Sequence, residues 1–299
     1  MDLAGDNESR RFEAFKANAR YVNEFNKKEG MTYELRLNQF ADMTFEEFAV
    51  KYAGAKVDAA ALSSVPEADE EELVSFAPTV WDWRHHGVVT PVKNQNPCGS
   101  CWAFSSVGTV ESAYAIATKR LLRLSEQQVL DCSDAGDCNG GWPSKVLQDF
   151  AVKKGIALDQ RGYPPYYPAY QAKKLQCRTV AGKPVVKING FGAVPFSDEI
   201  ALKQRVYKQP VSVLVKADGV YSGPCGASLN HAVMVVGYSV TRDNIKYWIV
   251  KNSWGTGWGE RGYIRMKRDV TAKEDFCGIA MYGMYPIMKT VPISMVADE

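Results

Sequence analysis

The chain of 299 residues has only three histidines, and it lacks an apolar run of the roughly 18 residues that a membrane-spanning helix needs. Its first ten residues also lack the apolar core of a secretory signal peptide. Either the protein is cytosolic, or a signal has been removed before Met1. The basic residues are scattered and no nucleic-acid reader motif is present, so we expect neither a nucleic-acid nor a membrane partner.

The surroundings of Cys98 and Cys101, which form a C-x-x-C pair, argue against metal and redox chemistry. A zinc site needs about four ligands, and the chain has no second C-x-x-C and no H-x₃-H pair. Redox chemistry of the thioredoxin type would place the pair after a strand in a βαβ unit, and the preceding P-V-K-N-Q-N-P gives no sign of one. We therefore expect no metal and no cofactor, and nucleophilic catalysis remains.

The chain has seven cysteines, and an odd number in a secreted protein suggests paired bridges plus one free thiol. Three bridges could pair six cysteines in about 15 ways, among which the residues alone do not choose. The alternative is a cytosolic protein with buried thiols.

Charge is divided unevenly along the chain. Up to Phe76 there are nine Lys and Arg against sixteen Asp and Glu, a net charge of −7. From Ala77 onward there are 27 against 18, a net charge of +9. Two oppositely charged pieces attract each other, although two unrelated solvated surfaces would look the same.

The acidic N-terminal piece is expected to be helical and to end in a connector. Residues 8–28 have the pattern of a helix, and a short second helix is expected after Asp42-Met43-Thr44, where either Asp42 or Thr44 can cap it. Residues 53–73 are small and acidic and lack aromatics, so we interpret them as an exposed connector and a natural site of proteolytic cutting.

A helix-rich half precedes a strand-rich half in the remaining chain. A helix is expected from Ser100 to about Lys119, with an apolar stripe, and a second capped helix at 124–130. Four later runs are typical of strands: V-S-V-L-V, H-A-V-M-V-V-G-Y, Y-W-I-V-K-N-S-W and G-Y-I-R-M. This order suggests two lobes.

The histidines differ in their surroundings. His85 and His86 lie in a polar, turn-like stretch and are expected to be exposed and without a catalytic role. His231 stands at the entrance of an apolar strand, where it is either a packing residue or a partner for a nucleophile. Cys101 would open the helix that follows it, and a helix N-terminus lowers the pKa of a thiol.

Three motifs together resemble the papain family of cysteine proteases, above all its plant members. They are Q-N-P-C-G-S-C-W, N-H-A-V and K-N-S-W-G, with His231 placed 130 residues after Cys101 and Asn252 placed 21 after His231. The resemblance implies an α+β fold with two lobes, one helical and one β-barrel-like, preceded by an α-helical propeptide. It divides the chain into residues 1–76, 77–187 and 188–299.

The resemblance also implies a role for each residue of the site. Cys101 would be the thiolate nucleophile, and His231 its imidazolium partner and general acid. Asn252 would fix the orientation and tautomer of the imidazole, and Trp254 would shield their hydrogen bond from water. Gln95 would donate its side-chain amide to the oxyanion. Taken alone, Gln95 and Asn252 could be loop polar residues and Trp254 a core residue.

Further positions follow from the same resemblance. It implies the disulfides Cys98–Cys138, Cys132–Cys177 and Cys225–Cys277, which leave Cys101 free. The residues expected to bind substrate are Gly140, Gly141, Trp142, Pro143, Leu214, Leu229, Ala232 and Tyr282; none is charged, although Tyr282 could instead only pack.

The acidic piece resembles the inhibitory propeptide of the family. The positions that match its two motifs are Arg11, Phe15, Asn18, Val22, Asn26, Asn38, Phe40 and Asp42. Two positions depart from the motifs: Asn7 replaces a usual Glu, and Arg36 replaces a usual Gly. We therefore expect the first helix to start late or to be truncated. Asn7-Glu8-Ser9 is also an N-glycosylation sequon, a weak signal by itself.

The function expected from these residues is that of a cysteine endopeptidase zymogen. It would prefer an apolar residue at P2, two positions before the scissile bond, and would be activated at acid pH by cleavage within residues 66–77, with Ala77 at the usual mature start. We expect a monomer of the secretory pathway, in a vacuole or lysosome-like compartment or outside the cell. Cystatin-type proteins are the expected inhibitors.

Three other functions are alternatives to that of an endopeptidase. Peptide ligation would use the same acyl-enzyme with an amine in place of water. A non-catalytic storage or binding homologue would typically have lost the nucleophile. An exopeptidase would need an insertion that blocks one end of the cleft, and no suitable insertion is present. Residues 217–225 are about ten residues shorter than is usual in the family, beside the cleft.

Overall fold

The computed structural model describes residues 3–29, 34–63, 65, 76–159, 167–179, 185–217, 228–269 and 276–289. Its helical elements are α1 (Leu3–Asn26), α2 (Phe45–Tyr52), α3 (Ala59–Ser63), η2 (Trp83–His86), α4 (Cys101–Thr118), α5 (Glu126–Cys132), α6 (Pro143–Lys145), η3 (Val146–Ala151), α7 (Glu199–Lys208) and η4 (Phe276–Gly278). Its strands are β1 (Trp81–Asp82), β2 (Gly136–Asp137), β3 (Gly140–Gly141), β4 (Ile156–Ala157), β5 (Val185–Val186), β6 (Gly190–Val194), β7 (Val211–Val215), β8 (His231–Val240), β9 (Lys246–Lys251), β10 (Tyr263–Lys267) and β11 (Gly283–Ile287).

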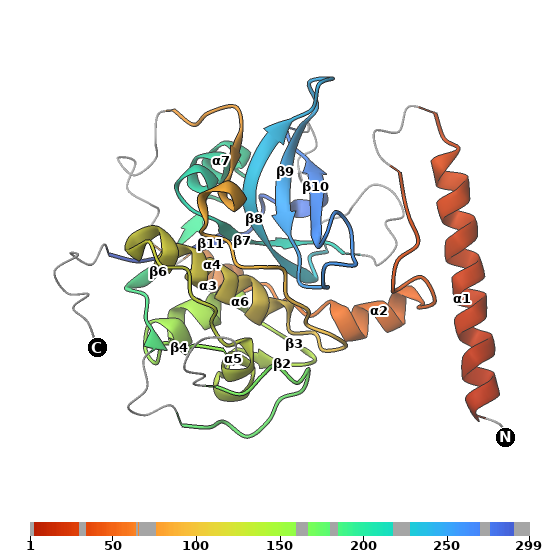
Figure 1. The fold of residues 1–299 in the computed structure, drawn as a ribbon, viewed down its shortest axis with the longest axis horizontal. Helices are drawn as coiled ribbons and strands as arrows, with labels where there is room; N and C mark the ends of the chain where they lie inside the picture. The colour runs from red at the N-terminus through yellow and green to blue at the C-terminus, as the bar shows by residue number, and fades with distance from the viewer. Residues whose placement is uncertain are drawn as a thin grey trace.

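The main sheet is antiparallel and runs in the order β10-β9-β8-β7-β11-β6, with the short β1 paired to β8 (Figure 1). The four runs that the sequence pattern predicted as strands correspond to β7, β8, β9 and β10. All five residues of β7 are buried, which fits its unbroken V-S-V-L-V sequence better than a half-exposed alternating pattern. The register places Val215 opposite His231 and thereby sets where the histidine stands.

The helix α4 is buried on nearly all sides, whereas its apolar stripe predicted burial on one side only. Its polar residues are buried because each finds a partner. The Ser105 hydroxyl lies 2.6 Å from that of Ser212 and donates to the carbonyl of Val233 at 2.7 Å, while Ser112 donates to the carbonyl of Val88. Hydrogen bonding removes most of the cost of burying these hydroxyls, so α4 can pack between the two halves of the molecule.

The structure has two main hydrophobic cores, and α4 contributes to the first of them. One is formed mainly by residues of the helix-rich half, with Trp102, Leu130 and Leu147 among its fully buried side chains. The other is formed by the main sheet and α7 and contains Tyr238 and Trp248. None of the helices in the described ranges is both long and apolar enough to cross a membrane.

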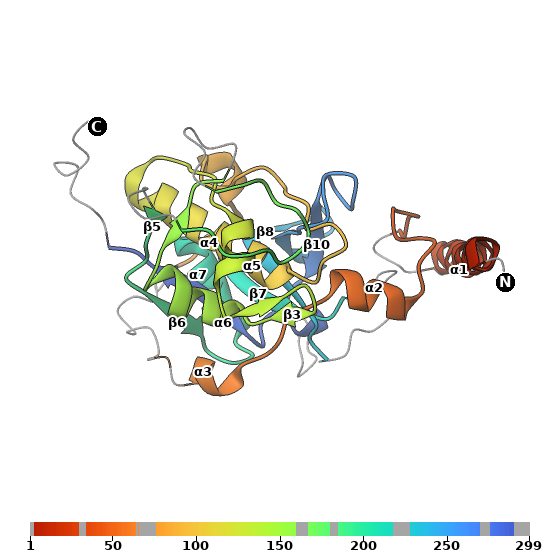
Figure 2. The same cartoon turned by 90° about the horizontal axis from the view of Figure 1, so that it is seen from below.

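The N-terminal elements extend from one end of the molecule across to another side. In Figures 1 and 2, α1 lies at one end, set apart from the body, α2 follows, and α3 lies across the molecule. The expected cap of α2 is present: the Thr44 hydroxyl accepts from the backbone of Glu47, whose carboxylate accepts from the backbone of Thr44. This reciprocal capping box satisfies two free donors at the helix start.

The expectation that the first helix might start late is wrong, because α1 begins at Leu3, before Asn7. A helix can pass through Asn7, since no cap is required inside it. Arg36 is exposed and does not have a positive φ, so the position usually taken by glycine accepts a side chain here.

The side chains of the propeptide motif hold α1 to the segment that follows. Asn18 donates to the carbonyls of Ala41 and Met43 at 2.8 and 3.1 Å. Asn26 donates to and accepts from the backbone of Leu35, both at 2.8 Å. Arg11 pairs with Asp42, the backbone N–H of Phe40 donates to the Asn38 side chain, and Val22 is half-buried while Phe15 remains exposed.

Candidate active site

Cys101 is the first residue of α4, and its thiol is fully buried. The free backbone N–H groups of a first helical turn surround it: those of Cys101 and Trp102 act on the sulfur, and so do the backbone groups of Ala232 and Gly54. Ala232 is the neighbour of His231 on β8, so the start of α4 and the start of β8 meet at this sulfur. Among the described cysteines, only Cys101 is free.

The segment that covers Cys101 belongs to residues predicted to form an exposed connector. That prediction is wrong for residues 53–55, because Ala55 is buried and backbone hydrogen bonds fix the chain around it, whereas Lys56 and Val57 are exposed as expected. Gly141 donates to the carbonyl of Gly54, and Lys56 donates to the carbonyl of Gly141, each at 2.8 Å, while Ala55 donates to Asn230 at 2.9 Å. The N-terminal piece of the chain therefore runs through the site as an added strand, parallel to Gly141.

His231 and Asn252 are joined by a hydrogen bond of 2.8 Å between Nε2 and Oδ1. The backbone N–H of Ser253 also donates to Asn252 Oδ1, at 2.7 Å, which identifies this atom as the acceptor oxygen. The neutral imidazole must then carry its proton on Nε2, which leaves Nδ1 as the free base. Nδ1 is buried and has no hydrogen-bond partner among the described residues, so the thiol of Cys101 is not bonded to it in this state.

Trp254 covers the imidazole. Its ring stacks on that of His231 with centroids 4.5 Å apart, and it is itself only 3% exposed. The other side of this cluster is formed by the N-terminal piece: Phe40 and Phe48 meet Trp254 edge-on at 5.4 and 5.2 Å. The aromatic contacts therefore connect the imidazole directly to the second motif of the propeptide.

Gln95 is fully buried, and its side chain is fixed at both ends. Its Oε1 accepts from the Ser253 hydroxyl at 2.6 Å, and its Nε2 donates to the carbonyl of Cys98 at 2.9 Å. The second hydrogen of this amide is directed at the carbonyl of Tyr52, at the end of α2, 3.0 Å away. The amide donor thus faces the same covering segment as Cys101.

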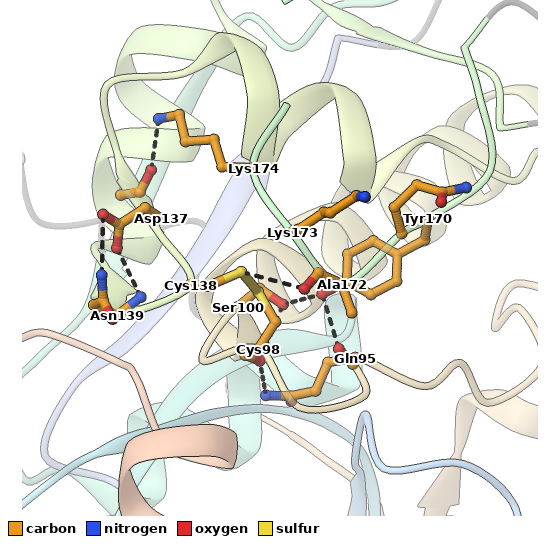
Figure 3. Close-up of a disulfide and its surroundings, with 12 residues drawn as sticks. Gln95, Cys98, Ser100, Asp137, Cys138, Asn139, Tyr170, Ala172, Lys173 and Lys174 are labelled. Atoms are coloured by element: carbon orange, nitrogen blue, oxygen red, sulfur yellow. Dashed lines mark hydrogen bonds between the residues drawn. A yellow bond between two sulfur atoms is a disulfide. The ribbon is translucent and has the colours of Figure 1, made fainter. Parts of the chain in front are cut away.

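A disulfide and a tyrosine support the loop that carries Gln95 (Figure 3). Cys98 is bonded to Cys138, and the hydroxyl of Tyr170 lies 2.6 Å from that of Ser100 and donates to the Gln95 carbonyl at 2.9 Å. The two sulfurs of the C-x-x-C pair therefore differ: Cys98 is oxidised and Cys101 is free.

Burial favours the neutral forms of both the Cys101 thiol and the His231 imidazole in the covered site. It raises the pKa of Cys101 to about 11, against the smaller opposing effect of the backbone N–H groups. It lowers the pKa of His231 to about 4, and the bond to Asn252 opposes this only in part. The lowered thiol pKa expected for a helix N-terminus is therefore wrong for this state, because the covering segment removes water from the sulfur.

The residues expected to bind substrate gather around the covering segment. Ala55 packs in one cluster with Cys101, Leu214 and Ala232, bordered by Leu229 and Tyr282. Gly140 and Gly141 form β3, whose backbone binds the segment, and the Trp142 ring that follows lies 4.6 Å from the ammonium of Lys56. Pro143 is buried, and its backbone carbonyl accepts a hydrogen bond from the Ser106 hydroxyl.

The remaining sequence-based assignments are placed as follows. The disulfide Cys132–Cys177 is present. Cys277 is disulfide-bonded, and its expected partner Cys225 lies outside the described residues, as does most of the shortened 217–225 segment. His85 and His86 are exposed and lie away from Cys101, in η2. In the described part of the chain, no three His, Cys, Asp or Glu side chains are grouped to hold a metal.

Reasoning from the sequence missed four contributors: Tyr52, Gly54, Ser253 and Tyr170. Ser253 could have been suspected, since it stands between Asn252 and Trp254 in the K-N-S-W motif. Tyr52 and Gly54 act through backbone atoms, which leave no signature of residue type. Tyr170 is 75 residues away from Gln95, and no local pattern connects them.

A buried thiol at a helix N-terminus, an imidazole oriented by an amide and a covering segment from the same chain define a thiol-dependent hydrolase in a latent form. Residues 77–287 match the papain family of cysteine proteases, and residues 4–48 match the cathepsin propeptide inhibitor domain (I29). The chain belongs to the papain family of cysteine proteases and has the organisation of a proenzyme.

Relatives of known structure or activity agree with this assignment. Fruit bromelain of Ananas comosus is 40% identical over 95% of this chain and 82% of that protein. The solved recombinant stem bromelain precursor is 42% identical, with a TM-score of 0.81 over 97% of this chain and 94% of that one. The proform of the ragweed pollen allergen Amb a 11, a cysteine protease, is 40% identical, with a TM-score of 0.83 over 95% and 89%.

Proposed function

We propose that the mature enzyme is an endopeptidase in which Cys101 attacks the peptide carbonyl and forms a thioacyl-enzyme. The observation that carries this proposal is the fixed tautomer of His231, which leaves Nδ1 as a free base. The next residue, Ala232, contacts the sulfur of Cys101 through its backbone, so the imidazole stands beside the thiol. Once the covering segment leaves, Nδ1 takes the thiol proton and returns it to the leaving amine. Asn252 orients the ring and Trp254 excludes water from their hydrogen bond.

Gln95 is the proposed side-chain donor to the oxyanion, together with the backbone N–H of Cys101. Its support is that the Gln95 amide already donates to a carbonyl of the covering segment, that of Tyr52. A donor held by Ser253 at its other end needs no reorganisation when charge develops on the substrate oxygen. We expect Gln95→Ala to lower kcat by roughly 10²-fold, a magnitude seen for the loss of one such donor.

The proposed preference at P2 is for an apolar side chain. Ala55 of the propeptide fills a space bordered by Leu214, Ala232 and Tyr282, and none of the three carries a charge that could pair with Arg or Glu. Burying an unpaired charge in this apolar space costs on the order of several kcal/mol. Peptides that differ only at P2 test the preference; equal cleavage of peptides with Leu, Arg and Glu at P2 would contradict it.

We propose that acid releases the propeptide for two reasons. Protonation of carboxylates weakens the attraction between the acidic N-terminal piece and the basic remainder. In addition, the pKa of His231 is held at about 4 only while it is covered, so protons favour the uncovered state below the ordinary pKa of 6.5. Cleavage within residues 66–77 would then leave Ala77 near the mature start.

Three further assignments complete the proposal. Disulfides persist in oxidising compartments, which supports a route through the secretory pathway to a vacuole, a lysosome-like compartment or the outside. We propose a monomer, inhibited by cystatin-type proteins that enter the cleft now filled by residues 53–57.

Incubation at pH 4 tests the proposal as a whole. A shift from 33.2 kDa to a smaller band that hydrolyses internal bonds of a protein substrate is the expected result. An added amine nucleophile separates hydrolysis from ligation, because a ligase would transfer the acyl group to the amine. A processed protein with neither activity would exclude both.

A further inference from the structure

The propeptide carries an accessible modification sequence near the start of α1. Asn7-Glu8-Ser9 is the only N-x-S/T sequence in the chain, and all three residues are exposed on α1. The Asn7 Oδ1 accepts from Arg10 at 3.3 Å, whereas its Nδ2 has no partner among the described residues. A substituent on Nδ2 would therefore leave the existing hydrogen bond in place.

A groove with two exposed aromatic rings adjoins this sequence. Phe12 and Phe15 are 58% and 39% exposed, although burial would be expected of such rings in a soluble protein. Residues three apart, such as Phe12 and Phe15, share one side of a helix, so α1 presents both rings next to the sequon. The lining residues of the groove are Asn7, Glu8, Ser9, Arg11, Phe12, Phe15 and Asp42.

We propose that Asn7 carries an N-linked glycan whose first sugars lie in this groove, against Phe12 and Phe15. The donor is a lipid-linked oligosaccharide diphosphate. Its anomeric carbon–oxygen bond breaks, a carbon–nitrogen bond forms to Asn7 Nδ2, the amide loses one proton, and the lipid diphosphate leaves. Transfer precedes folding, so the helical conformation of Asn7-Glu8-Ser9 in the folded chain does not prevent it.

The groove suits the apolar and polar sides of a sugar. The C–H side of a pyranose packs on an aromatic ring, and one side of Phe12 is taken by the Lys16 ammonium at 4.9 Å, which leaves the rest of its exposed area. The Arg11–Asp42 pair at the groove offers polar groups to sugar hydroxyls. A bulky, hydrated glycan would cover an apolar surface that otherwise favours association.

The position of Asn7 gives the modification a defined lifetime. It lies on α1, which Figure 1 shows at one end of the molecule, set apart from α4, the helix that begins at Cys101. Asn7 lies well before residues 66–77, so it is lost if cleavage occurs where we propose. The glycan would then mark only the zymogen, and the mature enzyme would carry no N-glycan, since the remaining chain has no sequon.

Secretion of the full proenzyme from a eukaryotic host tests the modification. The expected result is an intact mass above that of the chain, lowered by peptide N-glycosidase to that of the chain with Asp in place of Asn7, with the sugar on the fragment that contains Asn7. Ser9→Ala should abolish the added mass and Ser9→Thr should retain it. A secreted, disulfide-bonded proenzyme of unmodified mass would overturn the proposal, whatever its protease activity after acid treatment.

The packing of the glycan is tested by the rate at which the glycosidase releases it from the folded protein. Phe12→Ala should speed the release by about threefold or more, the equivalent of one lost ring contact. Phe45→Ala is the matched control, because Phe45 is 47% exposed but lies on α2 outside the groove, and its rate should not change. Equal rates in all three proteins would show that the sugars do not lie on Phe12.

Discussion

The side-chain amide of Gln95 donates to the backbone carbonyl of Tyr52 across 3.0 Å. Tyr52 ends the second helix of the propeptide, and two residues later Gly54 reaches the sulfur of Cys101. The covering segment therefore engages the nucleophile and the proposed oxyanion donor together. Inhibition in this chain therefore depends on where the backbone of Tyr52 and Gly54 lies relative to Gln95 and Cys101.

Gly54→Ala is expected to weaken inhibition. A Cβ at this position would lie 2.1 Å from the carbonyl oxygen of Gly99, closer than any real contact, and backbone cannot move away easily. The segment must then lift from Cys101, and activity of the uncleaved proenzyme toward a small peptide should rise by about tenfold or more, the equivalent of ~1.4 kcal/mol.

Gly257→Ala serves as the control for this change, since a Cβ there meets nothing within 4 Å and its φ is not positive. Its proenzyme should remain as inactive as the unsubstituted protein. Equal activity of the Gly54→Ala and Gly257→Ala proenzymes would contradict the tight passage of the segment.

Phe40→Ala is expected to loosen the propeptide, whereas Phe45→Ala is not. Phe40, which precedes α2, is 3% exposed and packs against Phe48 and Trp254, while Phe45, the first residue of α2, is 47% exposed. Truncation of a buried Phe costs about 3–5 kcal/mol. Thermal unfolding of the proenzyme should show the loss for Phe40→Ala only; similar losses for both would argue against the aromatic cluster.

The free energy of unfolding of the proenzyme should decrease as the pH falls through the range in which His231 takes up a proton. Its pKa is about 4 when folded and covered, against an ordinary 6.5, so the unfolded chain binds the proton first as pH falls. The loss in free energy of unfolding caused by His231 is absent above pH 6.5 and reaches about 3 kcal/mol near pH 4.

Unfolding free energies of Cys101→Ala and of Cys101→Ala/His231→Gln, measured between pH 7 and 4, isolate this contribution. The first should lose more stability on acidification than the second. Parallel curves would mean that His231 titrates normally beneath the propeptide.

Lys93→Ala is expected to destabilise the enzyme strongly. The Lys93 ammonium is buried and pairs with Glu111 at 2.6 Å and with Glu126, and the burial raises the pKa of Glu126. Removal of the cation leaves two carboxylates close together, a loss of about 3–5 kcal/mol by chemical denaturation. Lys153→Ala breaks an exposed pair with Asp149 and should cost at most about 0.5 kcal/mol; equal losses would contradict the burial.

Features that depend on neighbouring residues were predictable from the sequence. The Thr44 capping box, the start of α4 and the four strands follow from local chemistry and spacing. The family motifs added the fold and indicated which residues meet at the site. The bond of His231 to Asn252 is a contact of that kind, anticipated through the resemblance.

Features set by distant contacts were not predictable. Residues 53–57 look like a connector because a segment that fits between Gly99, Gly141 and Asn230 must be small, and small residues also mark loops. The apolar stripe of α4 did not reveal that its polar residues are buried as well, since their partners, such as Ser212 for Ser105, come from another part of the chain. The raised pKa of Cys101 depends on that same segment lying over the sulfur.

Titration with a thiol-directed peptide epoxide tests the central claim, that Cys101 is a nucleophile kept latent by its own propeptide. Before activation at neutral pH, the covered thiol with its pKa of about 11 should not be labelled. After acid activation, one equivalent should bind, with loss of proteolysis, and none should bind in Cys101→Ala. Labelling of the intact proenzyme at the same rate as the activated enzyme, or no labelling after the propeptide is removed, would contradict the account.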